Sequence, residues 1–378
     1  MKVAHVVRQY LPSIGGMEEV VRNLVQYQHT ETNYQPYVVT LDRVFREPQQ
    51  ALPAHETLDG IPVHRLPYRG SERYPWCPQV LKTLHAADLV HVHGVDFFYD
   101  FLALTRPLHR KPLVLSTHGG FFHTAFAQRL KRMYFHSITR ASSLAYSRVI
   151  ATSENDGDIF SQILNKRRLA VIENGVDIHK FDDTASPTLQ PKLIYFGRWS
   201  VNKGLLETLD VLAALCVQQP HTPWQLTIAG REYDLTADAI LAYATHKGIA
   251  ERVTIVPGPT NQELRQWIAQ ACYFICMSHH EGFGIAPIEA MSAGLRPILS
   301  AIPPFKRLVD STGVGLLLAA ADPTTQARQI AKWHTQHSLQ AANGPGRAAA
   351  RSAASAYAWT DVAARYTQQY DQVMEVRA

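Results

Sequence analysis

Two glutamates, Glu281 and Glu289, stand eight positions apart in the stretch HHEGFGIAPIEAMSAG. Glycines flank the first, and Gly282 and Gly284 would let backbone amides approach a ligand closely. The second lies about one turn inside a predicted helix that ends at Gly294. Glu281 could accept hydrogen bonds from sugar hydroxyls, and Glu289 from a second hydroxyl-bearing part of the same ligand. For either glutamate alone, a solvated helix charge is the commoner role.

A second group of residues has the chemistry of a diphosphate site. In YFGRWSVNKGLLETL, a predicted strand ends at Phe196 and a predicted helix begins near Gly204, with Arg198 and Lys203 in the loop between them. A helix N-terminus attracts anions, and the two basic side chains add charged donors. The loop is neither a Walker loop nor GxGxxG. An ordinary loop with two solvated basic residues is the alternative.

A paired-carboxylate site has one further interpretation, hydrolysis of a glycosidic bond. That chemistry needs carboxyl groups ~5–10 Å apart, with the pKa of one of them raised. The spacing of the two glutamates leaves this geometry open, but a glycosidase has no use for a diphosphate-type loop.

The elements that must position these residues form two series of strands that alternate with predicted helices. The first series includes KVAHVV, LVHVHG, PLVLSTHGG and SRVIATSE, and the second includes PKLIYFGR, WQLTIAG, RVTIVPG, CYFICMS and RPILSA. Such β-branched runs predict parallel sheets that helices cover on both faces. We therefore predict an α/β chain with one domain over residues 1–175, a linker over 176–190 and a second domain over 191–358. Ligands of such sheets bind beyond the carboxyl ends of the strands.

Composition narrows the function classes. The chain has 378 residues, 46% of them hydrophobic, and a net charge of +5, which suits an anionic ligand or surface. Basic residues are scattered without a nucleic-acid motif, so we predict no nucleic-acid partner. No apolar run reaches ~18 residues, and the N-terminus is too short and polar for a signal peptide, so we predict a cytoplasmic protein. Neither the cysteines nor the histidines show the spacing of metal ligands. We therefore predict free thiols at Cys77, Cys216, Cys272 and Cys276, and no metal site at His91, His93 and His118.

The stretch HHEGFGIAPIEAMSAG resembles the E-x7-E signature of retaining glycosyltransferases of the GT-B fold, in glycosyltransferase family 4. SIGGMEEVV, IENGVDIHKF, YFGRWSVNKG and AWTDVAARYTQQY follow in the order and spacing of that family, so the resemblance covers nearly the whole chain. It implies two Rossmann-like domains facing each other across a cleft. It also implies that the C-terminal helix, within residues 359–378, crosses back to the N-terminal domain.

The resemblance implies roles for the residues around the two glutamates. Glu281 would hydrogen-bond the donor sugar, helped by the backbone amides of Gly282, Phe283 and Gly284. Glu289 would bind the ribose of the nucleotide.

Further roles follow for residues outside that stretch. Arg198 and Lys203 would hold the diphosphate and stabilise its charge as the glycosidic bond breaks. Gly16 would approach the diphosphate from the N-terminal domain, and His118 would lie at the donor sugar in a positioning role. The expected catalytic set is thus Glu281, Arg198, Lys203 and His118. The family also implies transfer without a metal or cofactor, with attack on the face that the leaving phosphate occupies, so no general base is assigned.

The N-terminal stretch HVVRQYLPSIGGMEEVV is most similar to bacterial α-mannosyltransferases of this family that act on cellobiosyl-diphosphoprenol in exopolysaccharide assembly. That similarity implies GDP-mannose as the nucleotide-sugar donor and a lipid-diphosphate-linked sugar as the acceptor. A transferase that uses a UDP-sugar is the alternative within the family. An inactive GT-B scaffold is the alternative outside enzymes, although it would be expected to have lost part of the site.

Segment 126–147 has helical periodicity, with basic residues interleaved with apolar ones. Such a helix can lie on an anionic membrane surface, which would suit a lipid-linked acceptor and the cytoplasmic face of an inner membrane. A surface helix that packs on the sheet is the alternative. Asp96, at the end of a strand in HVHGVDFF, is a candidate contact for the acceptor.

Overall fold

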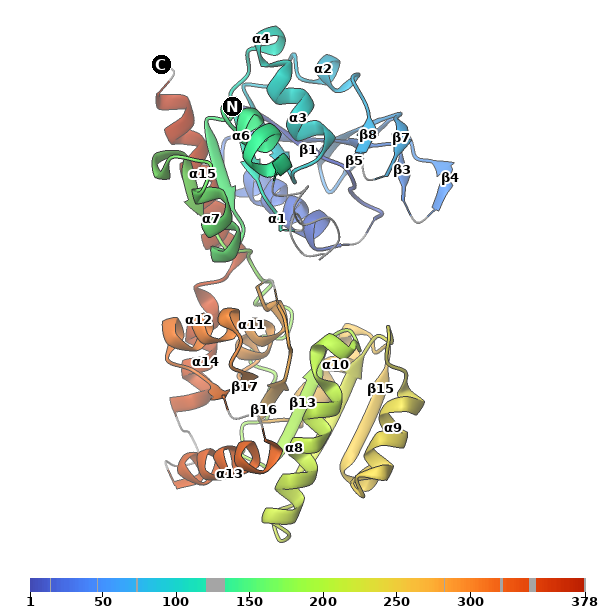
Figure 1. The fold of residues 1–378 in the computed structure, drawn as a ribbon, viewed down its shortest axis with the longest axis vertical. Helices are drawn as coiled ribbons and strands as arrows, with labels where there is room; N and C mark the ends of the chain where they lie inside the picture. Colours follow the sequence, from blue (N-terminus) through green and yellow to red (C-terminus); the bar gives the residue numbers. More distant parts are fainter. Residues whose placement is uncertain are drawn as a thin grey trace. The chain divides into compact units, whose positions relative to one another are not determined.

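The computed structural model describes residues 1–13, 15–45, 47–72, 74–119, 133–281, 283–319, 322–339 and 345–376. The chain divides into two compact units, Met1–Gly175 with Trp359–Ala378, and Val176–Ala358 (Figure 1). Residues 176–190, predicted as a linker, cluster with the second unit. As the family resemblance implied, the C-terminal helix belongs to the first unit.

The first unit is built on an eight-stranded sheet with the order β12-β11-β10-β9-β1-β2-β6-β5. All neighbours pair in parallel except β5, which forms an antiparallel hairpin with β6. Since β2 lies on one side of β1 and β9 on the other, the chain reverses direction across the sheet at β1. The strands are Lys2–Val7 (β1), Gln35–Leu41 (β2), His55–Leu58 (β5), Ile61–Leu66 (β6), Leu89–His93 (β9), Leu113–Ser116 (β10), Arg148–Ala151 (β11) and Leu169–Val171 (β12).

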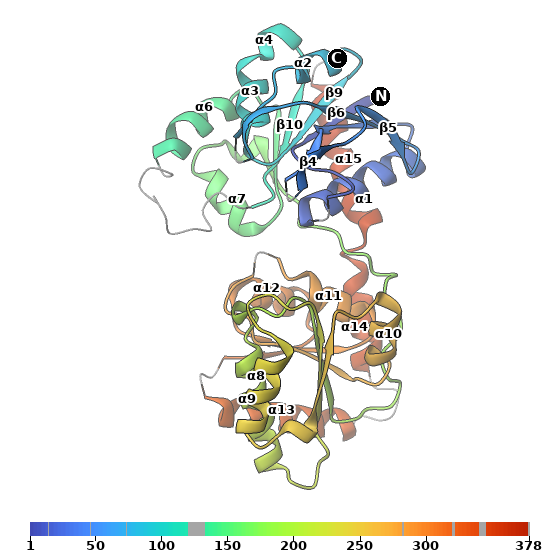
Figure 2. The same ribbon diagram turned by 90° about the vertical axis from the view of Figure 1, so that its right-hand side faces the viewer.

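Helices cover both faces of this sheet because successive strand residues point to opposite sides. On one face, Val3, Leu89 and Val114 share a core with α1 (Gly16–Glu31) and α15 (Trp359–Glu375). On the other, Val90 and Leu115 pack with α3 (Phe97–Leu104) and α7 (Glu154–Ser161). Figure 2 shows α1 and α15 on one side of the sheet and α3 on the other.

Short elements complete the first unit. Two small hairpins pair Arg43–Val44 (β3) with Glu47–Ala51 (β4) and Arg69–Ser71 (β7) with Tyr74–Trp76 (β8). The short helices are Val80–Thr83 (α2), Arg106–His109 (α4), the π-helix Phe135–Thr139 (η1), Arg140–Ser143 (α6) and the 3-10 turn Lys166–Arg168 (η2).

The second unit is built on a fully parallel sheet with the order β15-β14-β13-β16-β17-β18. Here the chain reverses direction across the sheet at β13, because β14 lies on one side of it and β16 on the other. The strands are Lys192–Phe196 (β13), Gln225–Gly230 (β14), Val253–Pro257 (β15), Tyr273–Cys276 (β16), Arg296–Ser300 (β17) and Leu316–Leu318 (β18).

One hydrophobic core runs through the second unit, and its largest buried side chains include Trp199 and Trp224. Helix α8 packs beside α13 and α9, and α11 packs beside α14. In the part of the chain that the structure describes, no helix combines the length and apolar character needed to cross a bilayer. The helices are Val201–Lys203 (η3, 3-10), Leu205–Gln218 (α8), Ala237–His246 (α9), Ala250–Arg252 (η4, 3-10), Asn261–Ile268 (α10), Ile285–Ser292 (α11), Pro303–Thr312 (α12), Pro323–Leu339 (α13) and Pro345–Ser355 (α14).

Candidate active site

The predicted site residues of the second unit lie near the point where its strand order reverses, at β13. Strand β16 pairs directly with β13, although β14 and β15 separate the two in the sequence. The loops that follow β13 and β16 therefore leave the same edge of the sheet side by side, at the place where open parallel sheets bind ligands. The first loop carries Arg198 and Lys203 into the N-terminus of α8, and the second carries Glu281 toward the N-terminus of α11.

Two residues predicted for different parts of the ligand contact each other. Lys203 Nζ lies 2.6 Å from Glu281 Oε1, and the same oxygen accepts a hydrogen bond of 2.7 Å from Ser278 Oγ. The Lys203 and Glu281 side chains are only 21% and 13% exposed. The contact therefore balances a cation and an anion at a largely shielded position, and it fixes the direction of both side chains.

Backbone and side-chain hydrogen bonds also join the two loops. The amide of His279 donates to the carbonyl of Asn202 at 2.9 Å, and Asn202 Nδ2 donates to the carbonyl of His280 at 2.8 Å. Gly204 lies between η3 and α8 with φ +64°, and a Cβ there would lie 2.1 Å from the carbonyl oxygen of Met277. Only glycine can occupy this close approach without moving backbone. The basic loop is thus held against the glutamate loop by contacts within the protein.

Arg198 is exposed and has an aromatic support. Its guanidinium lies over the ring of Tyr233, 4.5 Å from the ring centroid, and its carbonyl accepts a hydrogen bond of 2.9 Å from the Tyr195 hydroxyl. A cation over an aromatic face is attracted to it and loses rotational freedom. Tyr233 follows β14, so three successive strands of the sheet contribute to this side of the site.

Glu289 lies in α11 and forms an ion pair with Lys180, with 2.9 Å between Nζ and Oε1. Lys180 comes from the segment that the sequence predicts as a linker. Helix α11 begins after Gly284, whose φ is +94° and whose Cα lies so near Phe305 that a Cβ would come within 2.9 Å of the ring. Phe283 is half-buried, and Gly282 lies outside the described residues.

The candidate residues of the first unit also follow strands. Gly16 is the first residue of α1, and His118 comes two residues after β10 with a left-handed φ of +52°. Asp156 of α7 fixes the chain on either side of His118, since its Oδ2 accepts hydrogen bonds from Thr117 Oγ1 at 2.6 Å and from the Gly119 amide at 2.9 Å. A non-glycine residue held in this conformation by its surroundings is typical of functional loops.

An ion pair links the carboxyl ends of β1 and β9. Arg8 Nε lies 2.8 Å from Asp96 Oδ2, and Asp96 also caps α3 through the Phe98 amide. Burial raises the pKa of Asp96 to about 6, although Arg8 opposes the rise. Asp96, the candidate acceptor contact, therefore has a structural partner on its own sheet.

Three buried histidines lie close enough to suggest a metal site. The ligand atoms of His5, His91 and His93 all lie within 4.8 Å of one another. Each of their six ring nitrogens, however, has a hydrogen-bond partner within the protein at 2.6–3.0 Å; besides the histidines themselves, the partners are Gln28, Ser116, His118 and Tyr370. These directed contacts favour a hydrogen-bonded network over ligation of a cation.

Comparison with known proteins shows the family of this chain. A model of glycosyltransferase family 4 matches residues 14–180, and a model of group 1 glycosyl transferases matches residues 177–349. The chain is 49% identical to a GDP-mannose:cellobiosyl-diphosphopolyprenol alpha-mannosyltransferase of Xanthomonas oryzae pv. oryzae, over 100% of this chain and 98% of the relative. The chain belongs to glycosyltransferase family 4. A protein of the same description from Komagataeibacter xylinus is 42% identical over 99% of this chain and 94% of its own.

Solved structures show the same GT-B fold at low sequence identity. Sucrose-phosphate synthase from Thermosynechococcus elongatus matches with a TM-score of 0.71 and 20% identity, over 99% of both chains. The Anabaena protein HepE, in complex with UDP and glucose, matches with a TM-score of 0.70 and 19% identity, over 98% of this chain and 100% of that one. The predicted fold class and enzyme class of the family 4 chain are therefore confirmed.

Sequence reasoning missed three partners in this family 4 site. Tyr233 and Lys180 contact Arg198 and Glu289, and Gln28 contacts His5. A weak signal existed for the first two, since Tyr233 follows a predicted strand and Lys180 stands in IENGVDIHKF. No local signal marks Gln28, which lies in the last turn of an ordinary amphipathic helix.

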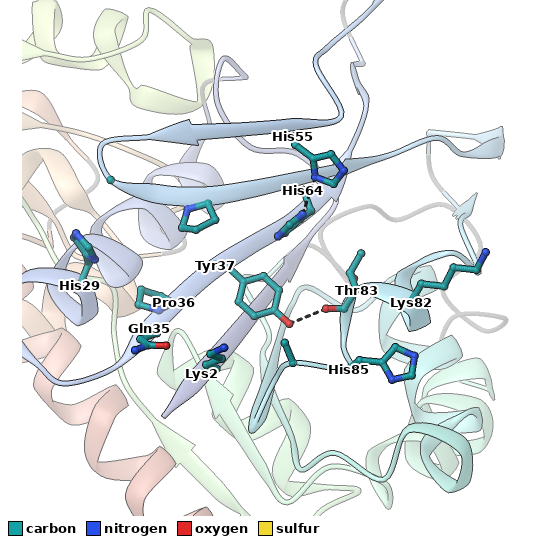
Figure 3. A pocket seen from close by; sticks show the side chains of 13 residues that line it. Lys2, His29, Gln35, Pro36, Tyr37, His55, His64, Lys82, Thr83 and His85 are labelled. Carbon is teal, nitrogen blue, oxygen red and sulfur yellow. Dashed lines mark hydrogen bonds between the residues drawn. The ribbon is translucent and has the colours of Figure 1, made fainter.

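A separate cavity of about 660 Å³ lies at the opposite edge of the first sheet, around the amino ends of β1, β2 and β6 (Figure 3). Tyr37 forms part of its wall, with its hydroxyl bonded to the carbonyl of Thr83 at 2.8 Å, and His55 and His64 lie against each other at its rim. None of the predicted site residues lines it. It is therefore distinct from the candidate active site.

Proposed function

We propose that this family 4 glycosyltransferase moves α-mannose from GDP-mannose to a diphosphopolyprenol-linked oligosaccharide in exopolysaccharide assembly. The observation that carries the proposal is the 49% identity, over essentially the full length of both chains, to proteins described as GDP-mannose:cellobiosyl-diphosphopolyprenol alpha-mannosyltransferases. The match covers both units, so it includes the residues expected to bind the donor.

The charged groups of the second unit support the proposed chemistry. The leaving group is a nucleoside diphosphate, and stabilising its developing charge lowers the barrier to transfer. Arg198, Lys203 and the N-terminus of α8 supply positive charge and amide donors at one edge of the sheet. Glu281 beside Lys203 supplies an acceptor for a sugar hydroxyl, and Glu289 supplies one for the ribose.

We further propose that the transfer retains the configuration of the donor and needs neither a metal nor another cofactor. The protein cations named above can take the place of a divalent ion at the diphosphate. No general base is assigned, because the departing phosphate oxygen can accept the proton of the attacking hydroxyl. The acidic groups near Lys203 and Lys180 are already paired with those cations, which leaves them poorly suited to bind a metal ion.

Transfer can be tested with purified chain, a short-chain cellobiosyl-diphosphoprenol acceptor, and either GDP-mannose or UDP-glucose, each with and without EDTA. We expect an α-linked mannosyl product from GDP-mannose alone, in equal amounts with EDTA, and the one-bond C1–H1 coupling constant of the mannosyl residue reports the retained configuration. Product only from the UDP-sugar would favour the alternative donor, and loss of product with EDTA would overturn metal independence. Absence of transfer and of GDP or UDP binding would favour an inactive scaffold.

A contact with the cytoplasmic face of the inner membrane is part of the proposal. Apolar side chains on α3, α4 and the segment around η1 and α6 are 47–80% exposed, at Leu104, Leu108, Met133, Ile138 and Leu144. These elements lie beside one another in the first unit (Figures 1 and 2). Of the predicted basic segment 126–147, residues 126–132 lie outside the described residues. In residues 133–147, Phe135 packs into the core, which supports packing of the segment on the sheet, while Met133, Ile138 and Leu144 are exposed and available to a membrane surface.

Sedimentation with lipid vesicles tests the membrane contact. Leu104→Ser with Leu108→Ser should reduce binding to vesicles that contain anionic lipid by at least ~tenfold, because each buried CH₂ contributes about 0.8 kcal/mol and the loss of two already corresponds to roughly tenfold. Val217→Ser is the matched control, since Val217 is 81% exposed but lies on α8 in the other unit. Equal binding of the wild type and the double variant would contradict a membrane contact at this surface.

A further inference from the structure

A continuous line of hydrogen bonds runs through the first unit and ends at His118. Gln28 Oε1 lies 2.9 Å from His5 Nε2, His5 Nδ1 lies 3.0 Å from His93 Nε2, and His93 Nδ1 lies 2.9 Å from His118 Nε2. Gln28 comes from α1, His5 from β1, His93 from the end of β9, and His118 from the loop after β10. Gln28, His5 and His93 are fully buried.

The three histidines are neutral at physiological pH. Burial lowers the pKa of His5 to about 4 and that of His118 to about 3. Burial also lowers the pKa of His93 well below its usual value, and the neighbouring histidines lower it further. A neutral imidazole has one N–H and one nitrogen lone pair. In a line of such rings, every nitrogen-to-nitrogen contact needs one donor and one acceptor, so the direction chosen at one end is transmitted to the other.

Gln28 sets this direction, because its amide oxygen can only accept. His5 must then donate from Nε2 and accept at Nδ1. His93 consequently donates from Nε2 to His5 and accepts at Nδ1, and His118 donates from Nε2 to His93. The Nδ1 atom of His118 is left with a lone pair, and no described residue forms a hydrogen bond to it.

We propose that Gln28, His5 and His93 are positioning residues that hold His118 in the Nε2–H tautomer, so that its Nδ1 accepts a hydrogen bond from a hydroxyl of the donor sugar. The inference rests on the proposed function for the identity of that sugar, but the tautomer does not depend on it. Asp156 fixes the loop on both sides of His118, and the histidine line fixes the ring. A ring fixed in both respects binds a hydroxyl without first having to change tautomer or rotamer.

A parallel network provides an internal control. His91 lies beside both His5 and His93, but its own nitrogens bond Ser116 Oγ at 2.8 Å and the Tyr370 hydroxyl at 2.6 Å. Ser116 is as deeply buried as Gln28. Ser116→Ala therefore removes a buried hydrogen bond of a neighbouring histidine and leaves the line from Gln28 to His118 intact.

The direct test is nitrogen NMR of the full chain with ¹⁵N-labelled histidine. The chain has 18 histidines, and the signals of His118 are those that disappear in His118→Asn. In the wild type, we expect Nε2 of His118 to give the signal of a protonated ring nitrogen and Nδ1 that of an unprotonated one. A reversed Gln28 amide would produce the reverse pattern. Either the reverse pattern or an averaged one, seen in the wild type alone, would overturn the proposal.

Gln28→Met removes the group that sets the direction while keeping the length of the side chain. We expect the His118 signals to move toward a mixture of tautomers in this variant and to stay unchanged in Ser116→Ala. Transfer by Gln28→Met should fall ~2- to 10-fold in kcat/KM for the donor, the effect of one misdirected neutral hydrogen bond, with Ser116→Ala close to wild type. An unchanged tautomer in Gln28→Met would show that the line of hydrogen bonds does not set the tautomer of His118. A changed tautomer with unchanged transfer would overturn the contact between His118 and the sugar. A wild-type chain that transfers no mannose would overturn the proposed function, and the NMR result would still decide whether the line sets the tautomer.

Discussion

Replacement of Glu281 by glutamine should change three properties differently: the stability of the second unit, its affinity for the nucleotide and the rate of transfer. Glu281→Gln keeps the size of the side chain and removes the negative charge that lies 2.6 Å from Lys203 Nζ. Both side chains are mostly shielded from water but not fully buried, so the lost charge-assisted bond is worth ~1–2 kcal/mol. For a unit of the size of Val176–Ala358, that loss lowers the Tm by about 2–8 °C.

Affinity and transfer should respond in different directions. GDP should bind Glu281→Gln as tightly as it binds the wild type, or more tightly, because Lys203 no longer has to leave a carboxylate to reach a phosphate. Transfer should fall by ~10- to 150-fold, since a hydrogen bond from a sugar hydroxyl to a charged acceptor is worth about 1.5–3 kcal/mol. Calorimetric titration with GDP, thermal unfolding and a mannose-transfer assay measure the three quantities on one preparation.

The control is Glu251→Gln, which removes one negative charge from an exposed turn in the same unit. It should match the wild type in all three assays. A Glu281→Gln enzyme that retains full transfer would refute the role of Glu281 at the sugar. A loss of GDP affinity greater than about tenfold would refute the expectation that the carboxylate competes with the phosphates for Lys203.

Three further predictions use other parts of the structure. A Cβ on Gly16 would meet nothing within 4 Å, whereas one on Gly204 would lie 2.1 Å from the Met277 carbonyl oxygen. Gly16→Ala should therefore unfold at the wild-type Tm but lose donor transfer, and Gly204→Ala should lose more than ~2 kcal/mol of unfolding free energy; equal effects on stability would contradict this. Tyr233→Ala should weaken GDP binding ~2- to 5-fold in calorimetry and Tyr233→Phe should not, because the ring face carries the cation contact. The pKa of His5 falls on folding from 6.5 to about 4, so its contribution to stability is present above pH 6.5 and is lost as the pH falls toward 4. The other buried histidines lose stability over the same range, so the unfolding free energy lost between pH 7 and pH 5 in urea should be ~2 kcal/mol smaller in His5→Leu than in the wild type, and equal losses in both proteins would count against it.

Most strands of the second unit were predictable because each is a short apolar run that ends at glycine, serine or proline. The predicted runs 191–198, 224–230, 252–258, 272–278 and 296–301 contain β13, β14, β15, β16 and β17. Strand β18 escaped prediction because a run of three leucines, Leu316–Leu318, has no period that distinguishes strand from helix. In the first unit, the predicted runs contain β1, β9, β10 and β11, whereas β2, β5, β6 and β12 were not predicted. Strand β5 carries little hydrophobic signal because its residues, His55–Leu58, are alternately exposed at the edge of the sheet.

Local sequence alone determined which residue types follow each strand, and hence that Arg198, Lys203, Glu281 and His118 would stand at strand ends. Tertiary structure alone decided which of them touch. Lys203 reaches Glu281 across 78 positions because β16 crosses over to pair with β13, and His118 joins Gln28 because β1, β9 and β10 are neighbours in one sheet. Strand order is set by how the helices pack on both faces of the sheet, a property of the whole unit. The pairing of charges and the direction of hydrogen bonds at the site follow from that order.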